Sequence, residues 1–469
     1  MRNRSAKGRA KTMKEPLYRA LAAELRREIR SGNLRSGDKL PSKRALAEEK
    51  KLSIMTVTGA LELLEAEGCI RAEERRGYFV ADGIRVDDMP EPEPEISQTC
   101  RFDFKSSNAA VEGFPFYTWA RLMRETLSEK DDRLLSAIDP KGVYELRCEI
   151  SRQLRLMRGI VCEPRQVIIG AGTEYLIGLI YQLLDKRRYA FESPGYTKAA
   201  KIYSHLGAKL SFIPTDSEGI CVDVIRRLNC IDVVQVTPSH SFPLGIVTSP
   251  DRRRELISWV AESDGRYIIE DDFDSEFRYS GKSYPSLYSL DHSDRVVYMN
   301  TFTRTLAPSM RIGYMILPPA LLKVFERDFM FYSSTVPALE QYVLARFIAD
   351  GAFERHLSRM RRIYRRRRDL LIEELSRFGD SVEVLGIEAG VHLLVALKDR
   401  LTERGVVKYA ASHGILLAGI GDYLPTGDDR IMFGDAVVVN FAGVSEDSIR
   451  EAVDIMYEGF RSRQKILGE

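Results

Sequence analysis

Two arginines stand close together in the stretch TFTRTLAPSMRIGY, which covers residues 301–314. The residues before it, RVVYMN (295–300), form a short apolar run of the kind that makes a strand. An arginine that follows a strand can clamp a phosphate in a bidentate fashion, because its guanidinium presents its donors in a fixed fork. Arg311 is therefore a candidate anion ligand, and Arg304 is a second cation beside it in the sequence.

Three further segments carry groups that suit a flat, phosphorylated ligand. In VIIGAGTEY (167–175), a strand and a Gly-rich turn lead into a helix, and the free N–H groups of Thr173 and Glu174 would bind a phosphate. FESPGY places Tyr196 after another strand, where its ring can stack on a flat ring. IIEDDFDSEFRY puts Asp271 at the C-terminal end of a strand, where a carboxylate can pair with a protonated pyridine nitrogen.

Each of these signals is weak alone. Gly-rich turns after strands are common, and the acidic segment around Asp271 could equally be a solvated turn or a metal site. His240, in TPSHSFPLG, is interpreted as structural rather than catalytic. The six cysteines are scattered and none forms a CxxC pair, so the sequence predicts neither a zinc site nor a disulfide framework.

The elements that must position these groups alternate between helix and strand from residue 102 to residue 469. Short runs rich in Val and Ile, such as QVIIGAG, IDVVQVTP and RYIIEDD, separate longer segments of helical periodicity. This alternation predicts an α/β body with a largely parallel sheet that is covered on both faces. The mixed pattern from about residue 315 predicts a smaller C-terminal α+β subdomain.

Residues 15–81 have a different pattern, which predicts a small separate domain. Leu17, Leu21, Leu25 and Ile29 give the first helix one apolar stripe. Ser42 and Ser53 are expected to cap two short helices joined by a tight turn, which is a helix-turn-helix layout. CIRAEERRGYFVAD then predicts a β-hairpin wing around a charged turn.

The charge is distributed unevenly between these two parts. Residues 1–81 carry 19 Lys and Arg against 11 Asp and Glu, so 19 − 11 = +8. The rest of the chain carries 51 against 57, or −6. A basic head on a mildly acidic body favours nucleic-acid binding by the head, although a solvated basic surface would give the same balance. We expect a basic tail over 1–14 and an acidic, Pro-rich linker over 82–101.

The head resembles the winged helix-turn-helix of the GntR regulators through PLY, GDKLPS, RALA, ALELLEAEG and RGYFVA, in family order. The resemblance implies that the third helix enters the major groove of DNA and that the wing meets the backbone or minor groove. The DNA-binding residues it implies are Ser42, Arg44, Thr56, Thr58, Arg75, Arg76 and Gly77. Ile54 and Thr58 replace arginines that are frequent in the family, which predicts weaker or tail-dependent binding. The alternative is a degenerate head that contacts only protein.

The body resembles the aminotransferase-like domain of the MocR family, in which a GntR-type head is fused to a fold-type I pyridoxal-phosphate (PLP) enzyme body. FPFYTW, DPKGVYELR, GAGTE, ESPGY, TPSHSFPLGIV and EDDFDSEFRY carry this resemblance. It implies a cytoplasmic regulator that forms a head-to-tail dimer, binds operator DNA through its heads and binds PLP in its body. The ligand contacts it implies are Thr173, Glu174, Tyr196, Asp271, Thr301, Thr303, Arg304 and Arg311.

Three positions depart from the family pattern. Arg304 replaces the lysine that attaches PLP covalently, and no lysine near it in the sequence takes its place. Arginine stays protonated and is not a usable amine nucleophile. Phe273 replaces the tyrosine whose hydroxyl touches the ring, and by the resemblance Val438 stands where aminotransferases keep an arginine for the substrate carboxylate. The sequence therefore predicts a regulator without catalysis.

Three alternatives for the ligand and the activity remain open at this stage. The favoured one is a body that binds PLP, or a preformed PLP–amine adduct, without a covalent bond. The second is a body that has drifted to another anionic effector held by Arg304 and Arg311. An active aminotransferase is the least favoured. The N-terminal residues lack the apolar core of a signal peptide, and no apolar run approaches the roughly 18 residues of a membrane span.

Overall fold

The computed structural model describes residues 16–74, 76–81, 100–106, 109–185, 187–280, 284–399, 401–425 and 434–462. The chain forms two compact units, a head that ends at Gln98 and a body that begins at Thr99. Arg75, the tail over 1–14 and most of the expected linker lie outside the described residues.

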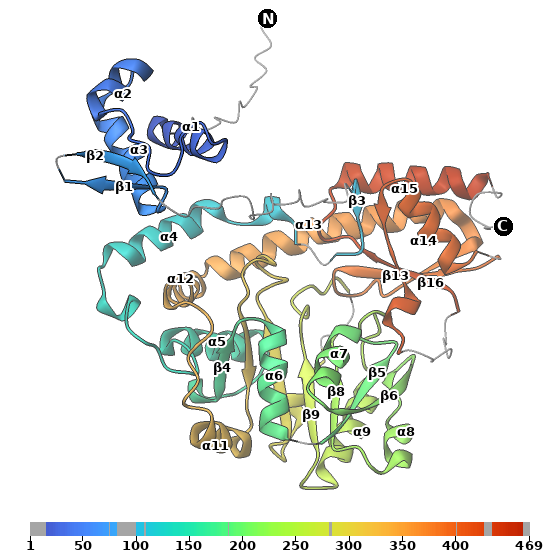
Figure 1. Ribbon diagram of the computed structural model, residues 1–469. Helices are drawn as coiled ribbons and strands as arrows, with labels where there is room; N and C mark the ends of the chain where they lie inside the picture. Colours follow the sequence, from blue (N-terminus) through green and yellow to red (C-terminus); the bar gives the residue numbers. More distant parts are fainter. Residues whose placement is uncertain are drawn as a thin grey trace, which may run out of the picture. The chain divides into compact units, whose positions relative to one another are not determined.

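The head consists of three helices and a two-stranded antiparallel wing (Figure 1). Its elements are α1 (Leu17–Arg30), α2 (Lys43–Lys50), α3 (Ile54–Ala66), β1 (Ile70–Glu73) and β2 (Gly77–Val80). The expected inner residues of α2 and α3 are buried, among them Leu46, Val57 and Leu61. Leu21 and Leu25 join them, but Leu17 is 63% exposed because it opens α1 at the edge of the core.

The body contains an eight-stranded sheet in the order β4-β11-β10-β9-β8-β5-β6-β7. Its strands are β4 (Val167–Gly170), β5 (Arg188–Ser193), β6 (Lys209–Asp216), β7 (Gly219–Ile220), β8 (Val233–Val236), β9 (Tyr267–Asp271), β10 (Val296–Thr301) and β11 (Gly313–Ile316). The central run from β10 to β6 is parallel, as predicted, while β11 runs antiparallel to both of its neighbours. The carboxyl ends of the parallel strands therefore meet at one edge.

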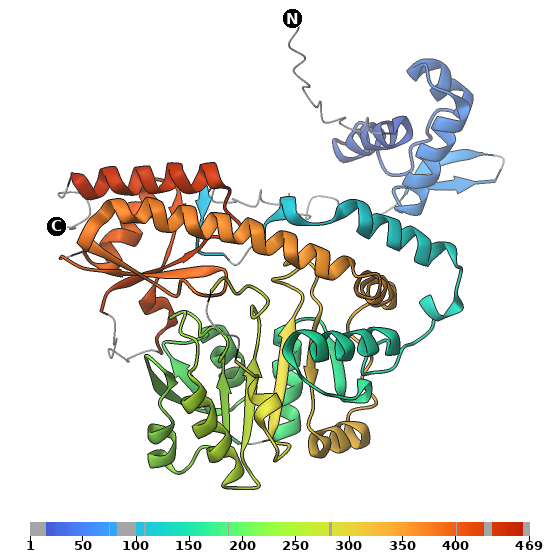
Figure 2. The same cartoon turned by 180° about the vertical axis from the view of Figure 1, so that it is seen from behind.

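Helices cover both faces of this sheet (Figures 1 and 2). The helices of this part of the body are α4 (Phe116–Ser128), α5 (Tyr144–Arg158), α6 (Thr173–Leu184), α7 (Thr197–His205), α8 (Val222–Leu228), α9 (Pro250–Ala261), α10 (Leu287–Leu290), α11 (Pro319–Asp328) and α12 (Ala338–Ala349). Of these, α4 lies beyond the faces of the sheet and packs against α12. Short 3-10 segments lie at Val111–Gly113, Asp132–Leu134 and Pro164–Gln166. Both faces of the central strands are buried, which explains why these strands read as continuous apolar runs.

A long helix, α13 (Ala352–Leu375), leads from the large sheet to a smaller subdomain. The small sheet has the order β12-β13-β16-β15. Its parts are β12 (Val382–Leu385), β13 (His392–Leu397), β15 (Ala418–Gly419) and β16 (Ala436–Asn440), with α14 (Glu403–Ser412), α15 (Glu446–Arg461) and 3-10 segments at Ser376–Ser381 and Ile420–Tyr423. A separate parallel pair joins β3 (Phe102–Asp103) to β14 (Ile415–Leu416).

The small subdomain begins later than the sequence analysis placed it. β11, at residues 313–316, pairs with β10 and β4 of the large sheet, and the first strand of the small sheet starts only at Val382. Periodicity identifies a strand but does not reveal which sheet it joins, so the estimate of about 315 was wrong. Phe102 and Phe104, from the start of the body, also pack into the small core.

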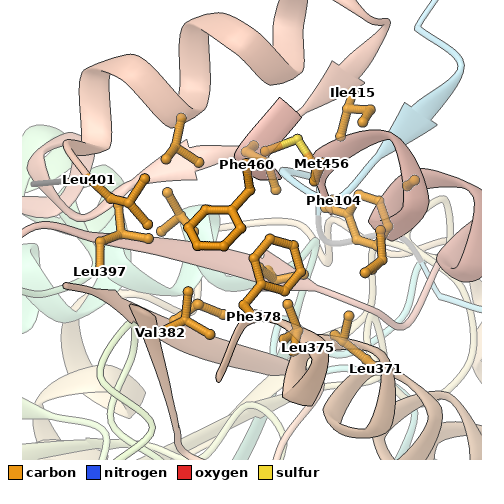
Figure 3. A pocket seen from close by; sticks show the side chains of 17 residues that line it. Phe104, Leu371, Leu375, Phe378, Val382, Leu397, Leu401, Ile415, Met456 and Phe460 are labelled. Atoms are coloured by element: carbon orange, nitrogen blue, oxygen red, sulfur yellow. The ribbon is translucent and has the colours of Figure 1, made fainter. Parts of the chain in front are cut away.

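The small core encloses a cavity of about 80 Å³ (Figure 3). Apolar side chains alone line it, including Phe104, Leu371, Phe378, Met456 and Phe460. Among the described residues, no charged or polar side chain lines this space, so they offer nothing there that could hold an anion. A polar ligand must bind elsewhere in the body.

Candidate nucleic-acid interface and candidate ligand pocket

The first candidate site is the outer surface of the helix-turn-helix in the head. Ser42 Oγ accepts from the backbone N–H of Ala45 at 3.2 Å and so caps α2. Arg44, the second residue of α2, is exposed. Thr56 is tied to Ser53: its N–H donates to Ser53 Oγ at 3.1 Å, and the two hydroxyls lie 2.8 Å apart. Thr58 is half-buried. Both caps that the sequence predicted are therefore present.

Two apolar side chains on α3 are exposed: Ile54, which was predicted only as the loss of a cation, and Met55, which was not predicted as a contact. Ile54 is 52% exposed and Met55 is 84% exposed, at the N-terminal end of the helix expected to read DNA. An apolar side chain at such a position can contact the methyl group of thymine in the major groove. Since the hydroxyl of Thr56 already binds Ser53, Met55 is the more accessible group for base contact.

The wing presents one arginine and one glycine among its described residues. Arg76 forms an ion pair with Glu73 and lies over the ring of Phe79, with Cζ 5.4 Å from the ring centroid. Gly77 has φ +107°, a conformation that favours glycine, and a Cβ there would lie 3.4 Å from Lys39 Cε. Arg75, the other residue expected in the wing tip, lies outside the described residues.

The second candidate site is a cavity of about 420 Å³ in the body. All eight residues expected to contact a ligand line this one cavity: Thr173, Glu174, Tyr196, Asp271, Thr301, Thr303, Arg304 and Arg311. They come from the starts of α6 and α7, the end of β9 and the segment after β10, at the carboxyl edge of the parallel strands. Lys105, Thr197, Lys198, Thr237, Phe242, Phe273, Pro308 and Tyr423 complete the wall.

One end of the cavity concentrates groups that bind anions. Arg311 Nη2 lies 2.7 Å from Glu174 Oε2, and Lys198 forms an ion pair with the other oxygen of the same carboxylate. Gly172, with φ +83°, allows this approach, because a Cβ there would lie 2.9 Å from Arg311 Nη2. Hydrogen bonding from Lys198 lowers the pKa of Glu174, so this carboxylate is ionised at neutral pH.

The hydroxyls of Thr301 and Thr303 belong to the same region. Thr301 Oγ1 donates to Thr303 Oγ1 at 2.7 Å, and the N–H of Thr303 donates to Thr301 Oγ1 at 3.1 Å. The backbone of the first turn of α6 adds the N–H groups that an α-helix leaves without intrahelical acceptors. The helix dipole, the hydroxyls and the cations are thus all groups that could bind one small anion in this part of the cavity.

The opposite end carries a buried carboxyl group and aromatic rings. Asp271 is 5% exposed at the end of β9. Burial raises its pKa to about 7, and the nearby Asp272 and Asp274 carboxylates add to the rise. A cationic partner would favour its ionised form. Tyr196 is 39% exposed on the cavity wall, where its ring is available to a flat ligand.

Arg304 lines the same cavity and lies near enough to Asp271 to oppose the rise of its pKa. Its Cζ is 5.8 Å from the centroid of the Phe273 ring, the position at which the family has tyrosine. Burial lowers the pKa of Arg304, while the Asp274 carboxylate opposes this shift. Asp274 in turn accepts a 3.0 Å hydrogen bond from His240 Nδ1, which supports the structural role expected for that histidine.

Two lysines far from Arg304 in the sequence nevertheless reach the cavity. Lys198 lies on α7 and binds Glu174, while Lys105 Nζ lies 2.9 Å from Asp422 Oδ2. The sequence analysis considered only lysines near Arg304 in sequence, and it missed both because long-range folding brings them in. Each amine pairs with a carboxylate, and the hydrogen bond to Glu174 raises the pKa of Lys198, which favours its protonated, non-nucleophilic form.

Comparison with known proteins agrees with both halves of this description. Residues 17–80 match the bacterial regulatory proteins of the gntR family, and residues 107–454 match aminotransferase class I and II. The chain belongs to the MocR-type GntR regulators. Members of this family combine the DNA-binding head with an aminotransferase-like body, which is the order found here.

Individual MocR-type relatives match over nearly the whole chain. The HTH-type transcriptional regulator YhdI of Bacillus subtilis is 35% identical over 94% of this chain and 95% of its own length. The pyridoxine biosynthesis transcriptional regulator PdxR of Corynebacterium glutamicum is 31% identical over 92% of this chain and 93% of its own length. The full domain order is therefore shared with named regulators.

Solved aminotransferases share the fold of the body. The kynurenine aminotransferase of Pyrococcus horikoshii has a TM-score of 0.69 and 23% identity, over 82% of this chain and 97% of that one. LysN of Thermus thermophilus, solved with N-(5'-phosphopyridoxyl)-L-leucine, has a TM-score of 0.67 and 22% identity, over 78% of this chain and 93% of that one. Within the described residues, we find no helix with the length and apolar character of a bilayer span.

Proposed function

We propose that this MocR-type chain is a DNA-binding transcription regulator whose body binds PLP, or an adduct of PLP with an amine, without a covalent bond. The observation that carries the proposal is the composition of the 420 Å³ cavity. One cavity is lined by anion-binding groups, a buried carboxyl group and a further guanidinium, that of Arg304. The relative PdxR is named as a regulator of pyridoxine biosynthesis, which supports a ligand of the vitamin B6 class.

The residues present fit the phosphate and the pyridine ring of PLP. Arg311, the start of α6 and the hydroxyls of Thr301 and Thr303 would hold the phosphate. Asp271 would pair with a protonated pyridine nitrogen, since a buried carboxyl group with a raised pKa gains most from a cationic partner. The ring of Tyr196 would stack on the pyridine ring.

The residues do not fit covalent attachment or turnover. Bound PLP acts in enzymes as an electron sink once it is linked to an amine. Arg304, which stands at the lysine position by resemblance, supplies no amine nucleophile. Val438 is 1% exposed in an apolar cluster with Phe242 and Leu394, so β16 places no cation at this position for a substrate carboxylate. We infer that the body senses its ligand and does not convert it.

A second candidate is an anionic effector unrelated to vitamin B6. The observation that favours it is the number of cations on the cavity wall, since Lys105, Lys198, Arg304 and Arg311 all line it. A small dicarboxylate or a phosphorylated metabolite could bridge two of them. Asp271 argues against this candidate, because its carboxylate, once ionised, would repel an anionic group of the ligand that lies beside it.

Regulation requires only that the ligand bind one arrangement of the assembly better than another. We propose a head-to-tail homodimer, in which such a shift would change the spacing of two heads on an operator. Exposed apolar side chains on the body concentrate between residues 116 and 161: Phe116, Tyr117, Leu127, Leu135, Tyr144, Leu156 and Val161. Exposed aromatic and aliphatic side chains are frequent in protein–protein interfaces, which supports the dimer. Sedimentation at about twice the 53.3 kDa chain mass would support the dimer.

The function is tested by titrating the purified full chain with PLP and following visible absorbance, intact mass after borohydride treatment, and binding to DNA from upstream of its own reading frame. Saturable PLP binding with no mass increase, and a PLP-dependent change in DNA affinity, are expected. A borohydride-stable adduct on the unaltered chain would contradict non-covalent binding. Absence of any preference over bulk DNA would contradict the regulatory role.

Replacing Glu174 by Gln should tighten the binding of PLP and of inorganic phosphate by roughly 3- to 20-fold. The Glu174 carboxylate forms ion pairs with Arg311 and Lys198. An incoming phosphate must therefore displace this carboxylate or bind beside a group of like charge. The estimate is modest because both partners are close to half exposed, so solvent screens them. Isothermal titration calorimetry measures the effect.

The matched control for this change is Glu145→Gln. Glu145 likewise lies in the first turn of a helix and pairs with an arginine, Arg133, at 2.9 Å, but it does not line the cavity. The control should bind both ligands like the unaltered chain. Equal or weaker binding by the Glu174 variant would show that this carboxylate assists the ligand rather than competing with it.

A further inference from the structure

The helix α13 carries eight arginines among its 24 residues, including the run RRRR at 365–368. Three of them point inward or toward the adjoining loops. Arg361 donates to Glu276 O, Arg367 binds the Glu112 carboxylate and Ala442 O, and Arg368 donates to Ile387 O and pairs with Asp369. These three tie α13 to the body by polar contacts, in addition to the packing of its buried apolar residues.

The other five, Arg355, Arg359, Arg362, Arg365 and Arg366, are exposed. Four of them, Arg355, Arg359, Arg362 and Arg366, follow the spacing i, i+4, i+7, i+11 and so share one face of the helix. We call these four the α13 arginine row. The buried residues of α13, such as Leu357, Met360 and Tyr364, occupy the opposite side. In Figure 2 no other helix crosses in front of α13.

The row is not neutralised by acidic neighbours. Among the residues that the structure describes, no carboxylate forms an ion pair with any arginine of the row. Arg355 and Arg359 donate only to the backbone carbonyls of Asp350 and Glu112, at 3.2 Å each. The nearest carboxylates in sequence or contact have other partners or are partly buried. They are Asp350, which pairs with Arg121, Glu354, which is half-buried, Asp369, which pairs with Arg368, and Glu112, which binds Arg367.

We propose that the α13 arginine row is a second DNA-binding surface, which holds the phosphate backbone of the duplex outside the segment read by the head. Charge complementarity carries the assignment, since four unneutralised guanidiniums in line match a row of phosphates. The row extends over about 17 Å, at 1.5 Å per residue for 11 residues. That length covers about five phosphates of one strand at 3.4 Å each.

The chain between the two units is long enough for both to contact one duplex. Residues 82–99 number 18, and a chain of that length can span at most about 60 Å. The surface would contribute affinity rather than sequence preference, because phosphate contacts carry no base information. It would also offset the cations missing at Ile54 and Thr58 in the head. The proposal rests on the proposed DNA-binding function.

The test compares the unaltered full chain with Arg355→Gln/Arg359→Gln/Arg362→Gln/Arg366→Gln. Fluorescence anisotropy on a 60-bp duplex of mixed sequence, between about 50 and 200 mM salt, gives the slope of log affinity against log salt. The variant should lose about 3.6 units of slope, since each of four phosphate contacts contributes about 0.9. Its affinity at the lower salt concentration should fall roughly 10- to 100-fold, with unchanged preference for the upstream DNA.

The matched control is Lys209→Gln/Arg227→Gln/Lys323→Gln/Arg404→Gln, which removes the same charge from exposed positions on β6, α8, α11 and α14. It should retain nearly the full slope. Equal slopes for the row variant and the unaltered chain overturn the proposal. If the row variant then sediments as a smaller species than the unaltered chain, the row belongs to a contact between copies of the chain. If the unaltered chain binds no duplex, the regulatory function itself fails.

Discussion

Replacing Asp271 by Asn should weaken PLP binding by roughly 2–4 kcal/mol, or 30- to 1,000-fold, while it stabilises the ligand-free protein. The loss follows because the amide cannot form a charge-assisted bond to a protonated pyridine nitrogen. The gain follows because the amide does not have to be desolvated as an anion. Weaker binding together with a gain in stability is expected of a buried acid that is desolvated without its partner, so the pair of effects tests this role.

The stability effect should depend on pH in a defined direction. Burial raises the pKa of Asp271 from 3.8 to about 7, so the folded chain binds a proton that the unfolded chain has released between these values. The stabilisation from the protonated acid is complete below pH 4 and is lost as pH rises to about 7, by roughly 4 kcal/mol in total. The Asn variant lacks this loss, so its Tm should exceed that of the unaltered chain most clearly above pH 7.

Asp422→Asn is the control for both measurements. The same change from a carboxylate to an amide is made at Asp422, which pairs with Lys105 but is about half exposed. This variant should bind PLP within a few-fold of the unaltered chain and should show no stabilisation at high pH. If Asp271→Asn binds PLP as tightly as the unaltered chain does, Asp271 is not the partner of the pyridine nitrogen.

Local sequence signals were sufficient where a group is positioned by its own element. Ser42 and Ser53 cap α2 and α3 because a hydroxyl at the N-cap satisfies a free N–H of the first turn, which depends on neighbours in sequence alone. Asp271 was placed at the end of a strand by the same kind of reasoning, because an apolar run ends there. The order of the motifs along the chain then predicted a DNA-binding head followed by an aminotransferase-like body.

Groups that reach the site from a distance could not be found this way. Lys105 precedes the large sheet by about 60 residues yet lines the cavity, and its partner Asp422 lies more than 300 residues further along. β3 joins β14 over a similar separation. The pairing of Glu174 with both Arg311 and Lys198 also depends on three separate elements. Such contacts are set by tertiary packing and leave no periodic pattern in the sequence.

Replacing Arg304 by Lys should convert non-covalent binding into covalent attachment. The lysine amine would lie on the wall of the same cavity, and burial there should lower its pKa as it lowers that of Arg304, which frees a nucleophilic amine. Borohydride treatment with PLP should then give about one stable adduct per chain, located at residue 304 by peptide mapping. Arg304→Gln, which removes the cation without adding an amine, should give none.

Attachment in this variant should occur without transamination. Val438 remains in its apolar cluster, so β16 still places no cation there for the carboxylate of an amino-acid substrate. Turnover with amino acids by the Lys variant would therefore contradict the assignment of Val438. An adduct at Lys105 or Lys198 in the unaltered chain would contradict the role of Arg304, because an existing lysine would then perform the task of the missing one. Binding and catalysis are thus separable at two residues, one in the ligand cavity and one on β16.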